Sequence, residues 1–178
     1  MNLAVVTFTE GKYPELMQEM LRSLVLPEGA VHHIIHCEPH EYERKRWECS
    51  LLADYLCFVD DDDVVINDSL SRCWALAQEH PEVGVVFTAQ HLITKHGHIL
   101  SDELMGSHGL ARVHYEDVPA HSQTIHHLAV IRSSAIHLGC GVLSQNIGTG
   151  IDWLMKGSAA LQHGALHLPI YGYQWRSW

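Results

Sequence analysis

Four consecutive aspartates, Asp60 to Asp63, follow an apolar run that has the composition of a buried strand. Four adjacent carboxylates repel one another, so ionising all of them without a counter-ion is costly. A hard divalent cation such as Mn²⁺ or Mg²⁺ relieves this repulsion and prefers oxygen ligands, usually one or two carboxylates together with phosphate oxygens. The pattern therefore predicts a cation that binds a phosphate-bearing substrate. The alternative is a solvated acidic turn, with Asp68 capping the helix that follows.

Two further groups could contribute to such chemistry. Asp152 lies in the stretch GTGIDW, where a helix is predicted to begin, and a helix N-cap is the simplest use of an aspartate there. Arg44, Lys45 and Arg46 form the only basic cluster. Arginine suits bidentate contact with phosphate, while exposed helix surface is the alternative for each of the three.

Alternating apolar segments predict the elements that must position these residues. Predicted strands occupy 2–8, 31–37, 55–59 and 83–89, and predicted helices lie between them at 14–26, 42–53 and 69–80. This alternation is typical of a Rossmann-like α/β fold with a mostly parallel central sheet flanked by helices. In such sheets ligands bind at the carboxyl ends of the strands, which is where the aspartates stand. A dinucleotide fingerprint, G-x-G-x-x-G, does not follow the first strand.

The second half predicts a smaller, mixed portion of the fold. A hairpin is expected to turn at His96-Gly97, and 101–125 is expected to be irregular and to lie over a site. A strand is predicted at 126–131 and a helix from about Ile151 to Gly164, before a last strand with an aromatic tail. We therefore predict one domain over 1–178, with a donor half at 1–90 and an acceptor half at 91–178.

Composition narrows the function classes. Eleven basic and 21 acidic residues give a formal charge of −10, which argues against non-specific binding to nucleic acid or anionic membranes. A modified nucleic acid remains open as a specific acceptor. Five cysteines without a C-x-x-C pair, no signal peptide and no membrane span predict a reduced, cytoplasmic protein. The 16 histidines lack metal-site spacing and are expected mainly on the surface or at strand edges, although His163 or His167 could furnish a third metal ligand.

The arrangement of strand, D-x-D-D and helix resembles the nucleotide-sugar site of family 2-like glycosyltransferases with the GT-A fold. The resemblance covers about residues 2–94 and 124–176, and G-x-D-W at a helix start with Y-x-W-R behind it makes it more specific than D-x-D alone. Two departures are TFTEG, in place of the usual P-T-Y-N, and Ile151-Asp152, in place of the acidic pair E-D.

The resemblance implies transfer of a sugar from a nucleoside diphosphate, UDP by default, to an acceptor hydroxyl with inversion. It makes Asp152 the general base, and it makes Asp60 and Asp62 the ligands of Mn²⁺ or Mg²⁺. Asp61 and Asp63 are candidates to orient the ribose or a metal-bound water, and Asp63 is also a candidate ligand. The predicted substrate-binding residues comprise positions after the first two strands, the basic cluster, the aspartates and the last strand: Thr7, Thr9, Glu10, Glu38, Arg44, Arg46, Asp60, Asp61, Trp175 and Arg176.

Two other functions fit the same residues. A metal-dependent nucleotidyltransferase would share the acidic strand end, although it would want a third acidic ligand on a neighbouring strand and would not need the late aspartate. A catalytically degenerate module that only binds a nucleotide sugar would keep the donor half and be indifferent to loss of Asp152.

Overall fold

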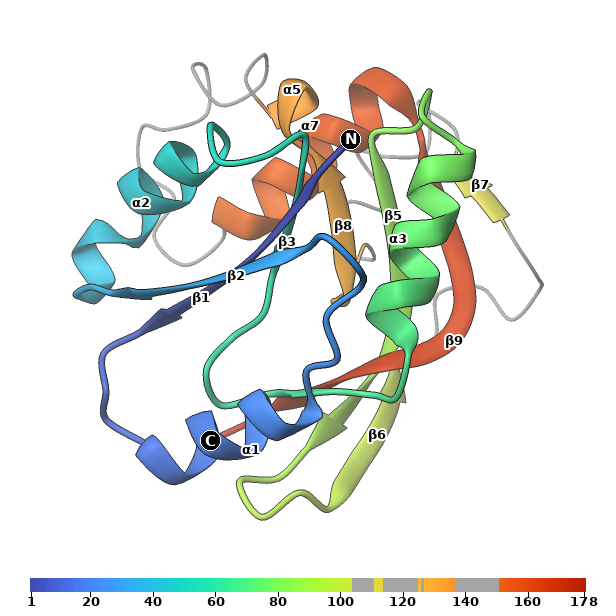
Figure 1. Cartoon of the computed structure of the whole chain (residues 1–178). Coiled ribbons are helices and arrows are strands. Elements are labelled where there is room, and N and C mark those ends of the chain that lie inside the picture. The colour runs from blue at the N-terminus through green and yellow to red at the C-terminus, as the bar shows by residue number, and fades with distance from the viewer. Residues whose placement is uncertain (104–110, 114–124, 126, 137–150) are drawn as a thin grey trace.

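The computed structural model describes residues 1–103, 111–113, 125, 127–136 and 151–178 (Figure 1). Its strands form one mixed sheet in the order β2-β1-β3-β8-β5-β9-β4, with β6 paired to β5 and β7 paired to β9. The strands are β1 (Leu3–Thr9), β2 (Val31–His36), β3 (Tyr55–Phe58), β4 (Val64–Val65), β5 (Val85–Ile93), β6 (Ile99–Glu103), β7 (Ala111–Val113), β8 (Ala129–Arg132) and β9 (Ala165–Arg176). The helices are α1 (Pro14–Ser23), η1 (Pro39–Glu41), α2 (Tyr42–Cys49), α3 (Ser69–Glu79), α5 (Ser133–Ile136) and α7 (Ile151–His163).

The predicted mostly parallel sheet is confirmed, with one difference in strand order. β1 runs parallel to β2 and β3, and β5 runs parallel to β9. The sequence pattern suggested that β5 would continue the parallel series after β3, but the antiparallel strand β8 lies between them. This insertion joins segments far apart in the chain, such as Cys57 and Val130, and local periodicity carries no information about such pairing.

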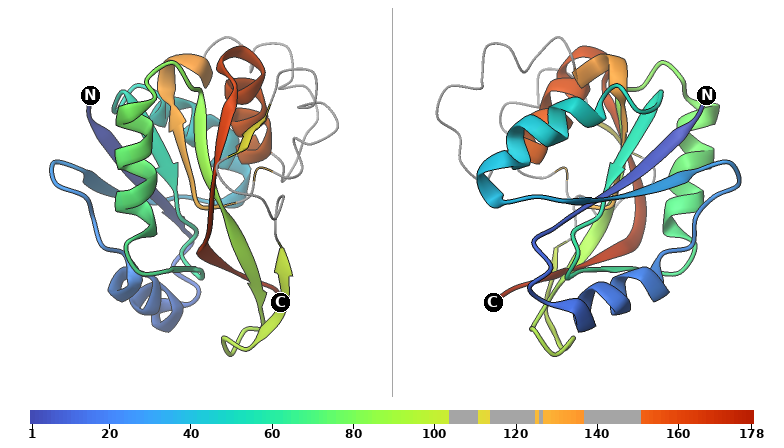
Figure 2. Two further views of the ribbon diagram at one scale, coloured as in Figure 1. Left: turned by 90° about the vertical axis from the view of Figure 1, so that its right-hand side faces the viewer. Right: turned by 60° about the vertical axis from the view of Figure 1, so that its left-hand side comes forward.

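Helices cover both faces of the sheet (Figures 1 and 2). Met20 of α1 and Leu70 and Trp74 of α3 pack with one hydrophobic cluster, while Cys49 of α2 and Met155 of α7 pack with the other. The three predicted crossover helices and the late helix are all present, and Pro14 occupies the first turn of α1 as expected. Within the described residues, no helix is both long enough and apolar enough to cross a membrane.

The approach of α7 to the sheet depends on a glycine. A Cβ atom at Gly84, just before β5, would lie 2.1 Å from the carbonyl oxygen of Ala159 in α7. Only a residue without a side chain permits this contact, so Gly84 fixes how closely α7 packs. The first turn of α7 holds Asp152, so this packing also bears on where the predicted base lies.

The hairpin predicted at His96-Gly97 is confirmed by the antiparallel pairing of β5 with β6. Gly97 has a φ of +82°, a conformation that favours glycine. The segment 101–125, expected to be irregular, includes the end of β6 and the short strand β7, and the rest of it lies outside the described residues.

Candidate functional site

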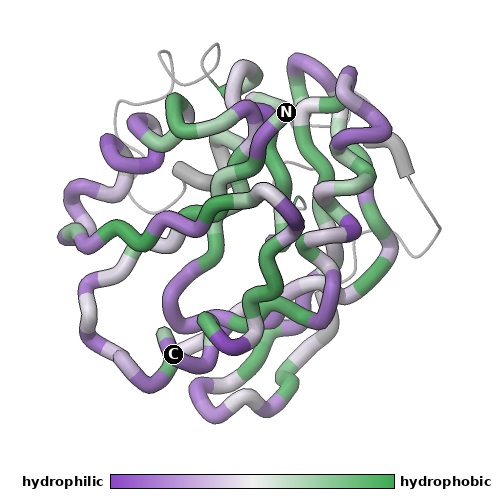
Figure 3. Tube along the Cα trace, viewed as in Figure 1, coloured by the Kyte–Doolittle hydropathy of each residue, from purple (hydrophilic) through white to green (hydrophobic). Residues whose placement is uncertain are grey.

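The aspartate run lies where β3 ends, on the turn that leads to β4. Figure 3 shows the hydrophobic colour of β3 giving way to hydrophilic colour along this turn. The amide of Asp63 donates a hydrogen bond to the carbonyl oxygen of Asp60 at 3.3 Å, so the four residues form one tight turn. The Asp60 side chain is 38% exposed, whereas Asp63 is only 1% exposed. The four identical residues therefore occupy different environments.

Arg46 of α2 reaches the aspartate run from the neighbouring helix. Its guanidinium lies 3.5 Å from a carboxylate oxygen of Asp60 and over the rings of Phe8 and Phe58, at 5.7 and 5.5 Å from their centroids. Because this arginine is buried, its charge is poorly screened by solvent and offsets part of the local negative potential. Arg44, two residues earlier, is instead exposed and paired with Glu41 and Glu48.

Hydrogen bonds from other parts of the protein also hold the backbone and side chains of the aspartate run. The amide of Asp60 donates a hydrogen bond to the hydroxyl of Tyr173 at 3.0 Å, and the backbone amide of Arg176 donates one to Asp63 Oδ1 at 2.7 Å. The Thr9 side chain hydrogen-bonds to Asp61. One turn thus receives contacts from the end of β1 and the end of β9.

Burial and mutual repulsion disfavour the charged form of this cluster. The pKa of Asp62 is raised, first by burial and then by the charges of Asp60 and Asp61, and the Trp178 hydrogen bond partly lowers it. Burial also raises the pKa of Asp61 and that of Asp63, the latter well above its usual value. A cation beside these carboxylates would relieve the repulsion that causes part of these shifts.

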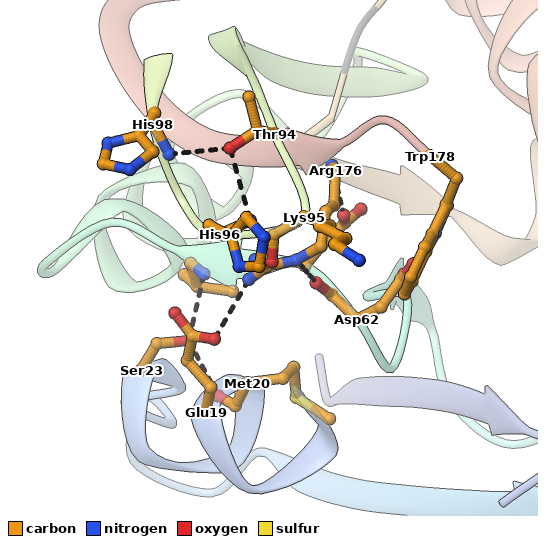
Figure 4. A network of polar contacts seen from close by, with 12 residues as sticks. Glu19, Met20, Ser23, Asp62, Thr94, Lys95, His96, His98, Arg176 and Trp178 are labelled. Carbon is orange, nitrogen blue, oxygen red and sulfur yellow. Dashed lines mark hydrogen bonds and ion pairs between the residues drawn. The ribbon is translucent and has the colours of Figure 1, made fainter. Parts of the chain in front are cut away.

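Arg176 lies inside the protein and its side chain is directed at protein acceptors. The side chain donates to the carbonyl oxygen of Asp62 at 2.5 Å, to that of Lys95 at 2.7 Å and to the Glu19 carboxylate at 3.0 Å (Figure 4). Only 3% of this residue is exposed. It was predicted to contact substrate together with Trp175. The structure places its guanidinium in a bridge between three protein segments and leaves Trp175 exposed, and contact of either residue with substrate stays a prediction.

A cavity of about 310 Å³ opens beside the run, at the ends of β1 and β2. It is lined by Thr9, Glu10, His36, Cys37, Glu38 and Glu41. The structure thus brings Thr9, Glu10 and Glu38, three of the predicted nucleoside-binding residues, to one cavity. Thr7 does not line it, because this residue is buried within β1 and its hydroxyl pairs with the His32 ring at 2.9 Å.

Two other predicted residues, Asp152 and His167, do not line this cavity. Asp152 is in the first turn of α7, as the sequence indicated, but the course of its side chain lies outside the described residues. His167 is buried on β9 against the Phe87 ring, with centroids 5.0 Å apart, and neither ring nitrogen has a hydrogen-bond partner among the described residues. Burial lowers the pKa of His167.

A larger hollow of about 630 Å³ lies at the opposite end of the sheet, between the start of β1 and the segment 50–55. None of the predicted site residues lines it, and Asp54 is the only acidic residue in its lining. Arg132 to Ser134 complete its lining. Size alone does not make it the functional site, and the chemistry favours the cavity at the carboxyl ends of β1 and β2.

The carboxylates of the aspartate run could hold a divalent cation only together with ligands from outside the described residues. Within the described residues, no group of three His, Cys, Asp or Glu side chains is arranged to hold a metal by itself. Mg²⁺-type sites commonly use one or two carboxylates and complete their coordination with phosphate oxygens and water. Asp60 and Asp62 could provide such a pair, while Asp63 is buried and its Oδ1 atom accepts the Arg176 amide.

Three aromatic residues at the site were not assigned there from the sequence. Tyr173 supports the Asp60 amide, Trp178 donates its indole N–H to Asp62 Oδ2 at 2.8 Å, and Tyr42 packs against Phe8. Burial and the nearby charges of Glu10 and the aspartates raise the pKa of Tyr42 to about 12, so its hydroxyl stays protonated. β9 ends at Arg176, so the alternation of a strand does not extend to Trp178, and no local sequence signal indicated these contacts.

Comparison with known proteins identifies the fold. No protein-family model and no curated protein sequence matches the chain. Among solved structures, S. aureus TarS 1–349 matches with a TM-score of 0.69 and 13% identity, covering 99% of this chain and 60% of that one. The TarS complex with UDP-GlcNAc matches with the same TM-score at 12% identity, covering 100% of this chain and 59% of that one. A197 from STIV matches with a TM-score of 0.56 and 13% identity, covering 95% and 82% of the two chains.

These matches confirm the GT-A-like fold that the sequence resemblance implied. The chain spans about 60% of the length of the TarS 1–349 structures. At these identities the likeness establishes the arrangement of the elements, and the chemistry must be argued from the side chains of this chain.

Proposed function

We propose that this protein is a metal-dependent glycosyltransferase that moves a sugar from a nucleoside-diphosphate donor to an acceptor hydroxyl. The observation that carries the proposal is the cavity at the ends of β1 and β2, which adjoins the aspartate run at the end of β3. A nucleoside-diphosphate donor needs a cavity for its nucleoside and, next to it, a site that can bind its diphosphate. The structures with the same fold include TarS bound to UDP and to UDP-GlcNAc, which supports UDP as the nucleotide.

The proposed cation is Mn²⁺ or Mg²⁺, with Asp60 and Asp62 as its protein ligands. When bound, the ion would neutralise the negative charge that develops on the departing diphosphate. Arg46 contributes to the same task, because its buried guanidinium already lies beside Asp60. Asp63 was also predicted as a ligand, but its Oδ1 atom accepts the Arg176 amide in this structure, and we assign it the support of the turn.

The nucleoside is proposed to occupy the cavity lined by Thr9, Glu10 and Glu38. Carboxylate oxygens accept hydrogen bonds, so the two glutamates suit the ribose hydroxyls and an N–H group on the edge of the base. Glu10 is ion-paired with Lys12, and the Glu38 side chain accepts the backbone N–H of Glu41 at the start of η1, so each glutamate already has one protein partner. Arg44 points away to its helix partners and is a weaker candidate for substrate contact.

Asp152 is the proposed general base. Its place in the first turn of α7 agrees with the family pattern, in which an aspartate precedes a helix packed on the sheet. It would take the proton of the acceptor hydroxyl as the oxygen attacks the anomeric carbon and the bond to the diphosphate breaks. A single displacement of this kind inverts the anomeric centre.

Ligand-dependent melting tests the proposal directly. The melting temperature should rise with Mn²⁺ and UDP or UDP-sugars together, because a ligand that binds only the folded state stabilises it by mass action. Nucleoside triphosphates serve as the comparison, and a larger shift with them, together with their hydrolysis, would favour a nucleotidyltransferase instead.

Asp152→Asn separates an enzyme from a binding module. We expect sugar transfer, or slow hydrolysis of the donor, to fall by about 100-fold or more, because a general base typically contributes a factor of that order. Donor binding, followed by the same melting shift, should persist. A wild-type protein that binds UDP-sugar but never turns it over, with or without this substitution, would identify the chain as a binding module.

A further inference from the structure

The last residues of the described chain hold Asp62 from two sides. The Arg176 side chain donates to the carbonyl oxygen of Asp62 at 2.5 Å, and the Trp178 indole N–H donates to its Oδ2 atom at 2.8 Å (Figure 4). Arg176 is itself anchored to Glu19 and to the backbone of Lys95. Backbone and side chain of the same aspartate are therefore both fixed by the end of β9.

The indole is also held in place by a second aromatic ring. Trp178 stacks on Tyr13, with ring centroids 4.5 Å apart and an interplanar angle of 25°. Tyr13 lies just before α1, in the segment that follows Glu10 at the end of β1. Trp178 thus connects the segment after β1 with the turn after β3, and both segments belong to the candidate donor site, together with the end of β2.

This contact contributes little that the fold requires. Trp178 is 63% exposed and Tyr13 is 41% exposed, so the pair buries less apolar surface than a core contact would. Its effect on Asp62 is more specific. A carboxylate repelled by two charged neighbours tends to rotate away from them, and a donor on one oxygen limits that rotation. An indole N–H can only donate, and it contacts the Oδ2 atom of Asp62 and not the Oδ1 atom.

We propose that Trp178 is a positioning residue, which orients the Asp62 carboxylate so that its Oδ1 atom is presented to the catalytic cation. The inference rests on the proposed function, and it adds a residue whose contact with the aspartate run the sequence pattern did not indicate. Hydrogen-bond partners of metal-ligating carboxylates commonly change metal affinity by about 10- to 100-fold when they are removed.

Trp178→Phe is the central variant, because it keeps a ring to stack on Tyr13 and removes only the N–H donor and the larger ring. Mn²⁺ affinity should be measured by isothermal titration calorimetry with UDP present, which requires no turnover. We expect the Kd for Mn²⁺ to rise about 10- to 100-fold. Ser177→Ala is the matched control in the same segment. It should leave the Kd within about twofold, because Ser177 is held through its backbone amide, which donates to Ile93, and its side chain makes no hydrogen bond to the described residues.

A double-mutant cycle tests whether Trp178 acts through Asp62. In an Asp62→Ala background, Trp178→Phe should produce no further change in Mn²⁺ affinity, since the carboxylate it orients is gone. The indole N–H resonance that Trp178→Phe removes from the NMR spectrum should also move in Asp62→Ala, which reports the hydrogen bond itself. Melting curves of each variant verify that the protein is folded.

The outcomes separate this inference from the proposed function. If the wild type binds Mn²⁺ with UDP and Trp178→Phe binds it as tightly or more tightly, the positioning role is wrong and the proposed function stands. If the wild type binds no Mn²⁺ in the presence of UDP, both are wrong. A weaker Kd that persists undiminished in the Asp62→Ala background would also overturn the positioning role, because the effect would then not pass through Asp62.

Discussion

Asp60 and Asp63 stand three residues apart, yet one side chain is 38% exposed and the other only 1%. On the proposed function, a run of carboxylates on one turn would serve cation binding at the expense of stability, because each charge repels its neighbours when no cation is present. Proteins commonly accept such a cost at functional sites. The aspartate run should therefore show opposite effects of substitution on activity and on the stability of the metal-free protein.

Asp62→Asn tests this opposition at the level of one residue. Loss of a ligand charge should lower metal-dependent sugar transfer by about 100-fold, since stabilising charge in the transition state is worth several kcal/mol. Without metal, the same variant should melt at the same temperature as the wild type or higher, because repulsion is reduced and the amide oxygen can still accept the Trp178 hydrogen bond. Asp68→Asn, at an exposed aspartate outside the run, is the control and should change neither quantity. A lower melting temperature of metal-free Asp62→Asn would contradict the argument.

Arg46 is the charge that makes the run tolerable in the absence of metal. Arg46→Met should lower the free energy of unfolding by about 1–3 kcal/mol, the usual range for removing the partner of a partly buried charged group. The loss includes the cation–π contacts with Phe8 and Phe58. Urea denaturation without metal measures it. Arg44→Met is the matched control on the same helix and should stay within about 0.5 kcal/mol, because its ion pairs are exposed. Equal effects of the two substitutions would refute the assignment of Arg46 to the site.

At the scale of elements, the end of β9 organises the site. Arg176 joins three separate segments: the aspartate turn, the β5–β6 hairpin through Lys95, and α1 through Glu19. Its backbone also holds Asp63. A single buried arginine therefore joins these three segments by hydrogen bonds, and removing it should destabilise all three together.

Arg176→Met should reduce the free energy of unfolding by about 3 kcal/mol, because it leaves two backbone carbonyls and a carboxylate without their donors. Hydrogen exchange should become faster in peptides that contain 60–63 and 94–98, while β1 should be less affected. Arg72→Met, on the exposed side of α3, provides the comparison and should cost no more than about 0.5 kcal/mol. Unchanged exchange in the hairpin would show that the bridge through Lys95 does not contribute to its stability.

The main elements and the starts of the early helices could be predicted from the sequence because the signals are local, whereas α1 ends at Ser23 and α2 at Cys49 instead of at residues 26 and 53. Pro14, the apolar period of α3 and Gly97 each act within a few residues, and the structure confirms the elements that they predicted. The position of β8 and the contact of Trp178 with Asp62, 116 residues apart, could not be predicted, because pairing across the chain is set by the packing of the whole sheet. The burial of Asp63 could not be predicted from the four consecutive aspartates either, because it too depends on packing against the distant end of β9.

At the scale of the whole molecule, charge and histidine content set the response to pH. The formal charge is −10 with histidine neutral, and 16 histidines can gain protons as the pH falls toward the isoelectric point of about 5.8. Reduced net charge lessens self-repulsion and favours the compact state. Buried histidines act in the opposite direction, because protonation of a buried ring is unfavourable. The measured pH dependence is the sum of both effects.

His167 allows the second effect to be isolated. Burial lowers its pKa in the folded protein, so the unfolded chain binds the proton more readily, and the stability contributed by the neutral ring is lost as the pH falls below about 6.5. At pH 5.5 this loss is at most about 1.4 kcal/mol, the limit set by the unfolded-state value. His167→Leu should remove this loss. The free energy of unfolding, measured with urea, should therefore fall less between pH 7.5 and pH 5.5 in His167→Leu than in the wild type. If His167→Leu and the wild type respond alike to pH, the His167 ring binds a proton as readily in the folded state as in the unfolded state. The buried ring must then have a partner when it is charged.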